Sequence, residues 1–212
     1  MLELSFSAVC FDLDGTLVDT EPRSRAAWQK LFQVHGVGLD PAQLARFAGR
    51  PGVEAIADHL PSFPGRSAES LFREALGYAR GADMPPVGPV AGALALLTRL
   101  GEKRVPMAVV TSGTKHYARA ELSGMGALHL FDVVVTADDV EHGKPHPEGY
   151  LAAAAALGVD PLDTVVFEDA PAGVRAARAA GAYCVALTTT HSRTDLGAAD
   201  ATVRDFSEIR WK

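Results

Sequence analysis

The chain has 212 residues, 48% of them hydrophobic, and its formal net charge is -6 at pH 7. A chain of this length can bury a sizeable core without disulfides, and its negative charge argues against nucleic-acid binding. No apolar stretch approaches the ~20 residues that a membrane-spanning helix needs, so we expect no membrane partner. The two cysteines lie in apolar runs, and we expect reduced core thiols and a cytoplasmic location.

The first predicted element is a strand at residues 7–11, because a continuous apolar run is typical of a strand covered on both faces. Gly15 and Thr16 end this run. A helix is predicted next, with Asp19 or Thr20 as its cap. From there to residue 85 the pattern is helical, interrupted by glycine and proline, without a convincing strand. This segment is therefore expected to be a small helical domain.

Strands and helices alternate after a proline-rich connector. We predict strands at 105–110, 133–136, 164–167 and 183–188, and helices at 90–100, 115–123, 148–157 and 172–180. This alternation predicts an α/β fold with a doubly wound parallel sheet, and the strand at 7–11 must join that sheet to be buried. The expected domains are an α/β core at 1–18 and 86–212, and a helical insertion at 19–85.

Polar residues follow four of the predicted strands. Ligands of open parallel sheets bind beyond the carboxyl ends of strands, so these residues are expected to meet. A single aspartate there is usually a turn residue, and a lysine before proline is usually a surface charge. Four such sets in succession favour a functional site, and their members are Asp12 and Asp14, then Thr111, Ser112 and Gly113, then Lys144, then Glu168 and Asp169.

Phosphoryl transfer is the chemistry that suits these residue types. Clustered carboxylates repel one another and demand a counter-cation, and oxygen ligands favour Mg²⁺. A carboxylate can also act as a nucleophile that forms an aspartyl-phosphate. Hydroxyl and backbone N–H groups of Thr111, Ser112 and Gly113, with the ammonium of Lys144, can bind the phosphoryl oxygens. Positioning and charge neutralisation account for most of this catalysis.

Four motifs carry a resemblance to a known family. "FDLDGTLVDT", "VVTSGT", "GKPHPEGY" and "VVFEDAPAGV" resemble, in order and spacing, the motifs of the haloacid dehalogenase (HAD) superfamily. They are most similar to those of its sugar-phosphate phosphatases and β-phosphoglucomutase-like members. The resemblance covers nearly the whole chain, and it implies a Rossmann-like core with a small helical cap domain between the first and second motifs.

The resemblance implies specific roles. Asp12 would be the nucleophile, and Asp14 would protonate the leaving oxygen and then activate water. Thr111 would hold the transferring phosphoryl group, while Lys144 would orient the nucleophile and offset charge. The implied Mg²⁺ ligands are Asp12, the backbone carbonyl of Asp14, and Asp169, with Glu168 in the inner or outer coordination sphere. Gly15 would permit a tight turn close to the phosphate.

A cap of this size implies a small-molecule phosphate ester, and Arg50 is the predicted cap residue that contacts the substrate. Ser24 stands where the mutase relatives carry a histidine, so a Mg²⁺-dependent sugar or polyol phosphatase is favoured over a β-phosphoglucomutase-type phosphotransferase. A catalytically silent sugar-phosphate binding module is a further alternative, which the catalytic residues present argue against. The sequence does not set the oligomeric state, and a monomer is compatible with it.

Two histidines flank the predicted catalytic lysine. His142 and His146 have a spacing that could hold a transition metal, but no second pair of nitrogen or sulfur ligands accompanies them. They are therefore interpreted as loop residues beside the phosphate site.

Overall fold

The computed structural model describes residues 1–47, 52–79, 81 and 83–212. The chain divides into two compact units, one made of Met1–Asp19 with Gly88–Lys212, and the other of Thr20–Val87. The boundaries thus follow residues 19 and 87, where the sequence analysis placed them after 18 and 85.

The first unit contains a six-stranded sheet with the order β6-β5-β2-β7-β8-β9, and all of its pairings are parallel. The expected doubly wound α/β fold is confirmed. The predicted strands lie within about two residues of their expected positions, and β9 was not predicted. The strands are β2 Ala8–Phe11, β5 Met107–Val110, β6 Val133–Val135, β7 Thr164–Glu168, β8 Tyr183–Leu187 and β9 Ala201–Val203.

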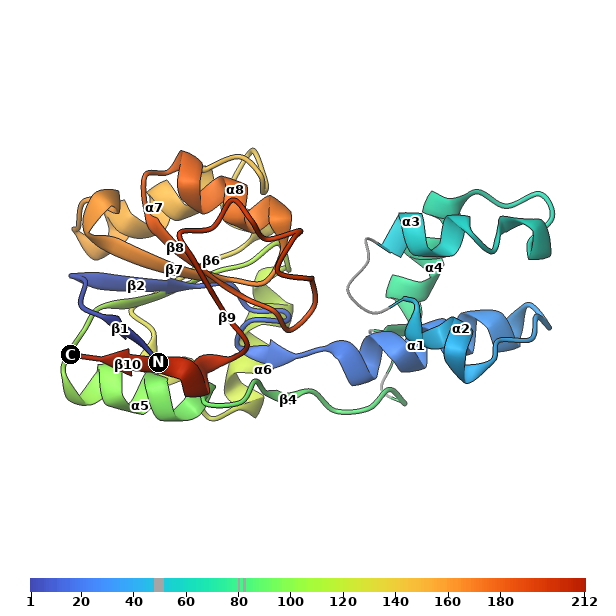
Figure 1. Cartoon of the computed structure of the whole chain (residues 1–212), viewed down its shortest axis with the longest axis horizontal. Coiled ribbons are helices and arrows are strands. Elements are labelled where there is room, and N and C mark those ends of the chain that lie inside the picture. The colour runs from blue at the N-terminus through green and yellow to red at the C-terminus, as the bar shows by residue number, and fades with distance from the viewer. Residues whose placement is uncertain (48–51, 80, 82) are drawn as a thin grey trace. The chain divides into compact units, whose positions relative to one another are not determined.

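Four helices cover the two faces of this sheet (Figure 1). Helices α7 and α8 pack on one face, where α7 contacts β5 and β6 and α8 contacts β7 and β8, and α5 lies on the other side of the sheet. Helix α7 ends at Gly158, as expected, because this residue adopts a left-handed φ of 71°. The helices are α5 Ala93–Glu102, α6 Lys115–Gly124, α7 Glu148–Leu157 and α8 Pro171–Ala179.

Helix α5 begins three residues later than predicted. Val90 pairs with an earlier segment, since its N–H donates to Leu17 O at 2.9 Å. Gly92 then adopts a left-handed φ of 81°, and a Cβ atom there would collide with the backbone at Phe206. The chain therefore turns before the helix starts, and an apolar pattern alone does not reveal this turn.

The core of the first unit lies on both faces of the sheet. On the face covered by α7 and α8, small side chains such as Ala153 and Ala177 allow close packing. On the other face, the rings of Phe11 and Phe167 stack with centroids 5.3 Å apart, and Phe206 packs against both. Cys10 and Cys184 are free and buried, as expected, and burial raises the pKa of the Cys10 thiol to about 12.

Two small additional sheets were not predicted, because strands of two or three residues have no detectable periodicity. One pairs β1 (Leu2–Leu4) with β10 (Ile209–Trp211) in parallel, and the other pairs β3 (Val18–Asp19) with β4 (Gly88–Pro89) in antiparallel. The second lies where the chain leaves and re-enters the first unit. The first unit also contains short 3₁₀ helices, which are η2 Leu128–Leu130, η3 Ala137–Asp139, η4 Pro161–Asp163 and η5 Phe206–Glu208.

All regular elements among the described residues of the second unit are helices. Its elements are α1 Glu21–Val34, α2 Pro41–Ala45, α3 Gly52–Ala57, η1 Leu60–Ser62 and α4 Ala68–Ala79. Pro22 lies in the first turn of α1, but Thr20 makes no side-chain capping bond, since its backbone is already helical (φ −90°, ψ −4°). Across both units, none of the helices described is long and apolar enough to cross a membrane. The cytoplasmic location stays a prediction.

A polar cluster on α4 joins distant parts of the second unit. The Glu74 carboxylate accepts bonds from Arg66 Nη2 at 2.6 Å and from Tyr78 Oη at 2.9 Å, and it lies 2.9 Å from His35 Nε2. Partial burial raises the pKa of Glu74, but these three partners outweigh it, so the pKa lies below its usual value of 4.5. The ionised carboxylate therefore contributes to stability.

Replacing Glu74→Gln is expected to lower the free energy of unfolding by about 1–2 kcal/mol at pH 7. Because the folded-state pKa is lowered, this contribution is complete above the usual pKa of 4.5 and is lost as the pH falls through the lower folded-state pKa. Urea denaturation should therefore show a difference between wild type and variant that shrinks below roughly pH 4. Glu102→Gln, an exposed glutamate of α5, is the control, and an equal loss in both variants would contradict the assignment.

Candidate active site

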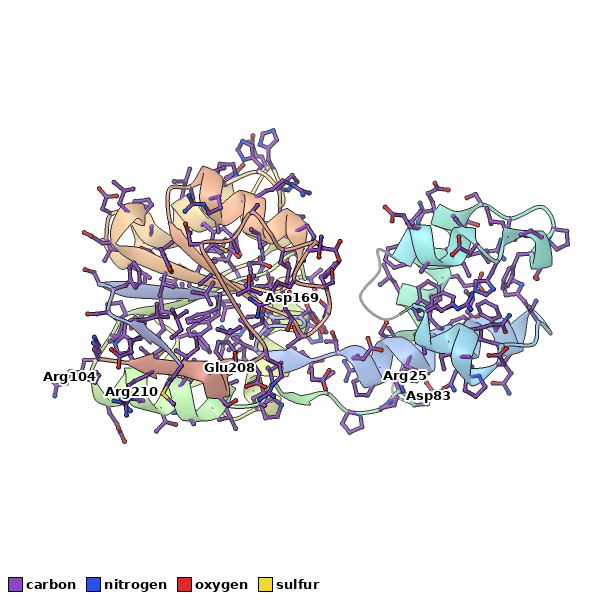
Figure 2. The ribbon with its side chains drawn as sticks, in the orientation of Figure 1. Arg25, Asp83, Arg104, Asp169, Glu208 and Arg210 are labelled. Carbon is purple, nitrogen blue, oxygen red and sulfur yellow. The ribbon has the colours of Figure 1, made fainter. Side chains whose placement is uncertain are left out.

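Polar side chains meet where three neighbouring strands of the parallel sheet end. Asp12 follows β2, Thr111 follows β5, and β7 ends at Glu168, with Asp169 next. The N–H of Asp12 donates to Phe167 O at 2.9 Å, which extends the β2–β7 pairing to the polar residue. These four side chains are buried. Asp169 lies beyond the strand ends of the first unit (Figure 2).

Lys144 brings the loop before α7 to these strand ends. Its Nζ donates to Asp12 Oδ1 at 2.5 Å, to Glu168 Oε1 at 2.6 Å and to Val110 O at 2.9 Å. An ammonium group has three donors, and all three are used. Burial alone would lower the pKa of Lys144, but the two carboxylates raise it well above its usual value, so the group stays charged.

Glu168 is held on both carboxylate oxygens. Tyr150 Oη donates to Oε1 at 2.7 Å, and the N–H groups of Asp169 and Ala170 donate to Oε2 at 3.1 and 3.3 Å. The side chain is 1% exposed. It packs against the first turn of α8 at Gly173, where any Cβ atom would overlap the carboxylate. Glycine is therefore required at position 173 by a neighbour and not by its own backbone conformation.

Asp169 is bonded through hydroxyl groups. Thr16 Oγ1 donates to Oδ1 at 3.2 Å, and Thr190 Oγ1 donates to Oδ2. Gly15 approaches the same carboxylate, since it adopts a left-handed φ of 78° and a Cβ atom there would overlap Asp169 Oδ2. The predicted tight turn at Gly15 is thus present, and the space it leaves is filled by Asp169 and Thr190.

Asp14 lies in a different environment from Asp12. Its Oδ1 accepts a bond of 2.5 Å from Tyr117 Oη, and the side chain is half-buried. Asp12, in contrast, is paired with Lys144. The two aspartates of the first motif therefore have separate partners, which is the arrangement that different chemical roles require.

The loop after β5 is folded on itself. Gly113 donates its N–H to Thr111 Oγ1 at 2.9 Å, so this predicted phosphate donor has a partner within the chain. Ser112 lies between them and is exposed. Arg50, the predicted substrate contact, lies outside the described residues.

Three carboxylates face one ammonium group in this site. Burial is the main reason that the pKa of Asp12 lies well above its usual range, with further increases from the Glu168 and Asp169 charges and a decrease from Lys144. Burial and the Glu168 charge likewise raise the pKa of Asp169 to about 7, although bonds from Thr190 and Thr16 oppose this. The site would therefore carry an excess of negative charge if all three carboxylates were ionised.

This donor set fits a hard divalent cation. Asp12, Glu168 and Asp169 each offer an oxygen, and these atoms lie within 4.8 Å of one another. Carboxylate oxygens are the ligands that Mg²⁺ prefers, and a cation would offset the repulsion that raises the pKa values. A buried acidic group that could hold a metal is therefore present.

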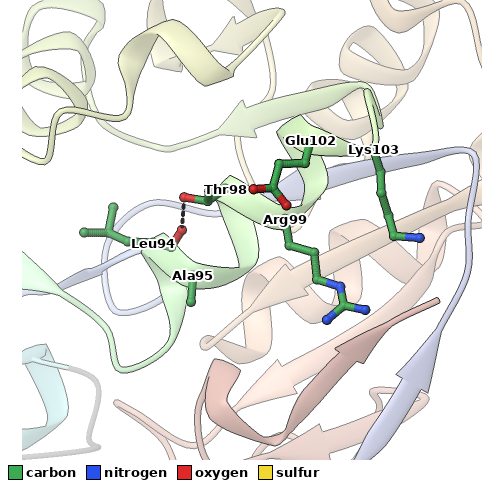
Figure 3. A pocket seen from close by; sticks show the side chains of 6 residues that line it. All are labelled: Leu94, Ala95, Thr98, Arg99, Glu102 and Lys103. Carbon is green, nitrogen blue, oxygen red and sulfur yellow. Dashed lines mark hydrogen bonds between the residues drawn. The ribbon is translucent and has the colours of Figure 1, made fainter.

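Two hollows differ in their chemistry. A cavity of about 360 Å³ reaches Thr111, Ser112, Lys144 and Tyr150, and so adjoins the carboxylates. A wider depression of about 620 Å³ runs along α5 and is lined by Leu94, Ala95, Thr98, Arg99, Glu102 and Lys103 (Figure 3). The hydroxyl group of Thr98 in this depression is already bonded within the helix, because Thr98 Oγ1 donates to Leu94 O. The smaller cavity is the better candidate for a substrate site, because it adjoins the polar residues at the strand ends.

Comparison with known proteins decides the family. Residues 6–181 match the model of the haloacid dehalogenase-like hydrolases. The chain belongs to this family. The resemblance inferred from the motifs, and with it the expectation of a hydrolase, is confirmed.

Individual relatives of the family are phosphatases. The chain is 50% identical over 206 residues to validoxylamine A 7'-phosphate phosphatase of Streptomyces hygroscopicus subsp. limoneus, covering 97% of both chains. It is 36% identical to hexitol phosphatase A of Escherichia coli, covering 94% of this chain and 91% of the relative. A HAD family hydrolase of Deinococcus radiodurans, solved with bound phosphate and sodium, has a TM-score of 0.76 and 27% identity, covering 96% and 93% of the two chains.

Several residues at the HAD site were missed in the sequence. Tyr117 and Tyr150 contact Asp14 and Glu168 from α6 and α7, and Thr190 contacts Asp169 from the loop after β8. Tyr150 is the last residue of the quoted motif "GKPHPEGY", but no role was predicted for it. Thr190 lies in the run "TTT" after a strand end, and this position is the signal that could have identified it.

Replacing Gly173→Ala is expected to lower the free energy of unfolding by about 2 kcal/mol or more. The new Cβ atom would overlap the Glu168 carboxylate, which Lys144, Tyr150 and two backbone N–H groups hold in place. Thermal and urea denaturation measure the effect. The control is Gly124→Ala, where no atom lies within 4 Å of the added methyl group. Similar stabilities of the two variants would rule out the proposed close contact.

Proposed function

We propose that this chain is a Mg²⁺-dependent phosphatase that hydrolyses a small sugar or polyol phosphate monoester through an aspartyl-phosphate on Asp12. The observation that carries the proposal is the contact of Asp12 with Lys144, beside Glu168 and Asp169. A carboxylate must be ionised to attack, and the buried ammonium favours the ionised form. The family and its phosphatase relatives support the same reaction.

In the proposed first step, a carboxylate oxygen of Asp12 attacks phosphorus while the ester P–O bond breaks. Asp14 gives its proton to the departing oxygen, which leaves as an alcohol. Thr111 Oγ1 binds a phosphoryl oxygen, and the positive charge of Lys144 helps to stabilise the negative charge that develops on the phosphoryl group. Lys144 thus serves both the nucleophile and the group that it attacks.

In the proposed second step, Asp14 is a carboxylate and takes a proton from water. The water oxygen attacks phosphorus, the bond between phosphorus and Asp12 breaks, and inorganic phosphate leaves. Mg²⁺, when bound, neutralises charge on the phosphoryl group, and the residues that would hold it are Asp12, Asp169, Glu168 and the backbone carbonyl of Asp14. Together, the two steps return Asp12 and Asp14 to their starting states.

The substrate class follows from the relatives and from the second unit. The curated relatives named above act, by their names, on validoxylamine A 7'-phosphate and on hexitol phosphate. We take the helical unit Thr20–Val87 as the cap that selects the alcohol part of the ester, with Arg50 as a contact. Ser24, in place of the histidine of the mutase relatives, favours hydrolysis over phosphoryl transfer between sugars.

A substrate screen tests the proposal. With Mg²⁺, the purified protein is expected to release phosphate from at least one hexose, pentose, hexitol or glycerol phosphate, or from validoxylamine A 7'-phosphate. Asp12→Asn should lower kcat by at least about a thousandfold in a protein that still folds, as a melting curve checks, because the shape of the side chain is kept. The control is the exposed Asp163→Asn, which should leave turnover unchanged.

Two results would refute parts of the proposal. Failure of every ester to release phosphate would refute the phosphatase activity, and substantial activity of Asp12→Asn would refute the role of Asp12 as the nucleophile.

Chelation by EDTA should abolish turnover, and added Mg²⁺ should restore it. Supplying β-glucose 1-phosphate with a bisphosphate activator tests the mutase alternative, which predicts glucose 6-phosphate without net release of phosphate.

A further inference from the structure

The loop that carries Lys144 inward presents a second group of ligands outward. His142, His146 and Glu148 lie together, and their side chains are 63%, 51% and 30% exposed. The two imidazole centroids are 4.7 Å apart. Potential ligand atoms of the three residues all lie within 4.8 Å of one another. The group is distinct from the buried carboxylates and shares no residue with them.

Glu148 is fixed as the base of this group. It lies in the first turn of α7, where its Oε1 accepts the N–H of Glu141 at 2.7 Å and its Oε2 accepts the N–H of His142 at 3.0 Å. These bonds lower the pKa of Glu148, so the group is a carboxylate near neutral pH. Oε1 can accept a second bond, while Oε2 also contacts His142 Nδ1 at 3.1 Å, a contact that a bound metal ion would replace.

The geometry is close to that of a bound metal ion. Glu148 Oε2 lies 3.1 Å from His142 Nδ1 and 3.7 Å from His146 Nδ1. Three ligands that hold Zn²⁺ tetrahedrally at ~2.0–2.1 Å are themselves roughly 3.3 Å apart. The ligand atoms lie within 4.8 Å of one another, so the two exposed imidazoles would have to move to reach this spacing. The metal would replace the long 3.4 Å contact of His146 Nδ1 with the Glu148 N–H.

We propose that His142, His146 and Glu148 form a second metal site that binds Zn²⁺ in preference to Mg²⁺. Two imidazoles and one carboxylate are a common ligand set for zinc, with the remaining position taken by water. Mg²⁺ prefers oxygen ligands and an octahedral shell, so it favours the buried carboxylates. His142 and His146 also line the cavity that reaches Lys144 and Thr111, which places the bound ion at the active site's own loop.

Calorimetric titration of the untagged protein with Zn²⁺, in a large excess of Mg²⁺, tests the site. One Zn²⁺ should bind per chain, and the affinity should fall at least about tenfold in His142→Ala and in His146→Ala. Glu148→Gln, which keeps the shape but removes the charge, should also weaken binding. The matched control is His129→Ala, an exposed histidine of η2, which should bind Zn²⁺ as the wild type does.

Three outcomes would overturn the zinc site. These are no binding in the presence of Mg²⁺, unchanged affinity in both histidine variants, and displacement of Zn²⁺ by added Mg²⁺. Melting temperatures of the variants show whether they fold, and their exposed side chains make a loss of fold unexpected. The measurement involves no turnover, so its result is independent of the proposed phosphatase activity.

Tyr117 carries a separate inference, which rests on the proposed role of Asp14. Its Oη donates to Asp14 Oδ1 at 2.5 Å from the first turn of α6. The loop after β5 shapes this contact, because Thr114 caps the helix by accepting the Tyr117 N–H at 3.4 Å. Gly113 leaves room for the ring, since a Cβ atom there would lie 2.8 Å from Tyr117 Cδ1.

We infer that Tyr117 is a positioning residue for proton transfer by Asp14. A phenol bonded to one carboxylate oxygen restricts the rotation of the carboxyl group that transfers the proton. Such a role matters most when the leaving oxygen needs a proton. Alkoxide leaving groups of sugar phosphates need one, whereas p-nitrophenolate is a stable anion and departs without it.

Leaving-group dependence tests this role. In Tyr117→Phe, kcat/KM should fall roughly tenfold for the best sugar phosphate of the screen but change less than about threefold for p-nitrophenyl phosphate. Asp14→Asn should show the same selectivity more strongly. The double variant should be no worse than Asp14→Asn alone, because the two residues act through one proton transfer. Tyr183→Phe, in β8, is the control.

The outcomes distinguish the positioning role of Tyr117 from the proposed acid role of Asp14. Equal losses on both substrates in Tyr117→Phe, or additive losses in the double variant, would overturn the positioning role. If Asp14→Asn itself shows no selectivity between the substrates, the proposed acid role of Asp14 fails instead.

Discussion

The candidate site depends on the hydrogen bonds of the buried Lys144 ammonium group. It joins the loop before α7 to the ends of β2, β5 and β7 through Asp12, Val110 O and Glu168. Burying a charge is costly unless its partners have good geometry, and here the three donors are all used. Loss of one partner would leave the others as poorly compensated buried charges, so strand ends and loop hold their positions together.

One ammonium does not balance three carboxylates, and this imbalance gives the site its chemistry. Asp12 and Asp169 have raised pKa values because burial and mutual repulsion disfavour their charged forms. Close contacts hold two of these carboxylates in place, since Gly15 lies against Asp169 and Gly173 of α8 lies against Glu168. The fold thus stores unfavourable electrostatic energy that a divalent cation would relieve, which is typical of functional sites.

Sequence patterns predicted the strand ends but not the side chains that reach them from elsewhere. Asp12, Thr111 and Asp169 follow apolar runs, and parallel topology brings such ends together. Tyr117 meets Asp14 across 103 positions of the chain, and no local pattern encodes that distance. Gly173 looks like an ordinary helix residue until Glu168 is placed beside it. Strands of two or three residues, such as β1 and β10, form only because a partner is already nearby.

The loop from residue 140 to 148 separates two kinds of ligand by direction. Lys144 points inward to oxygen atoms of buried carboxylates, while His142 and His146 are exposed beside Glu148. Nitrogen ligands favour zinc and oxygen ligands favour magnesium, so neighbouring residues can distinguish the two ions without competing for one. The same five-residue stretch, 142–146, supplies the ammonium group of Lys144, which offsets the charge of the buried carboxylates. It also supplies the two imidazoles at the rim of the adjoining cavity. Any ligand that fixes this rim therefore acts on a segment whose central residue holds Asp12.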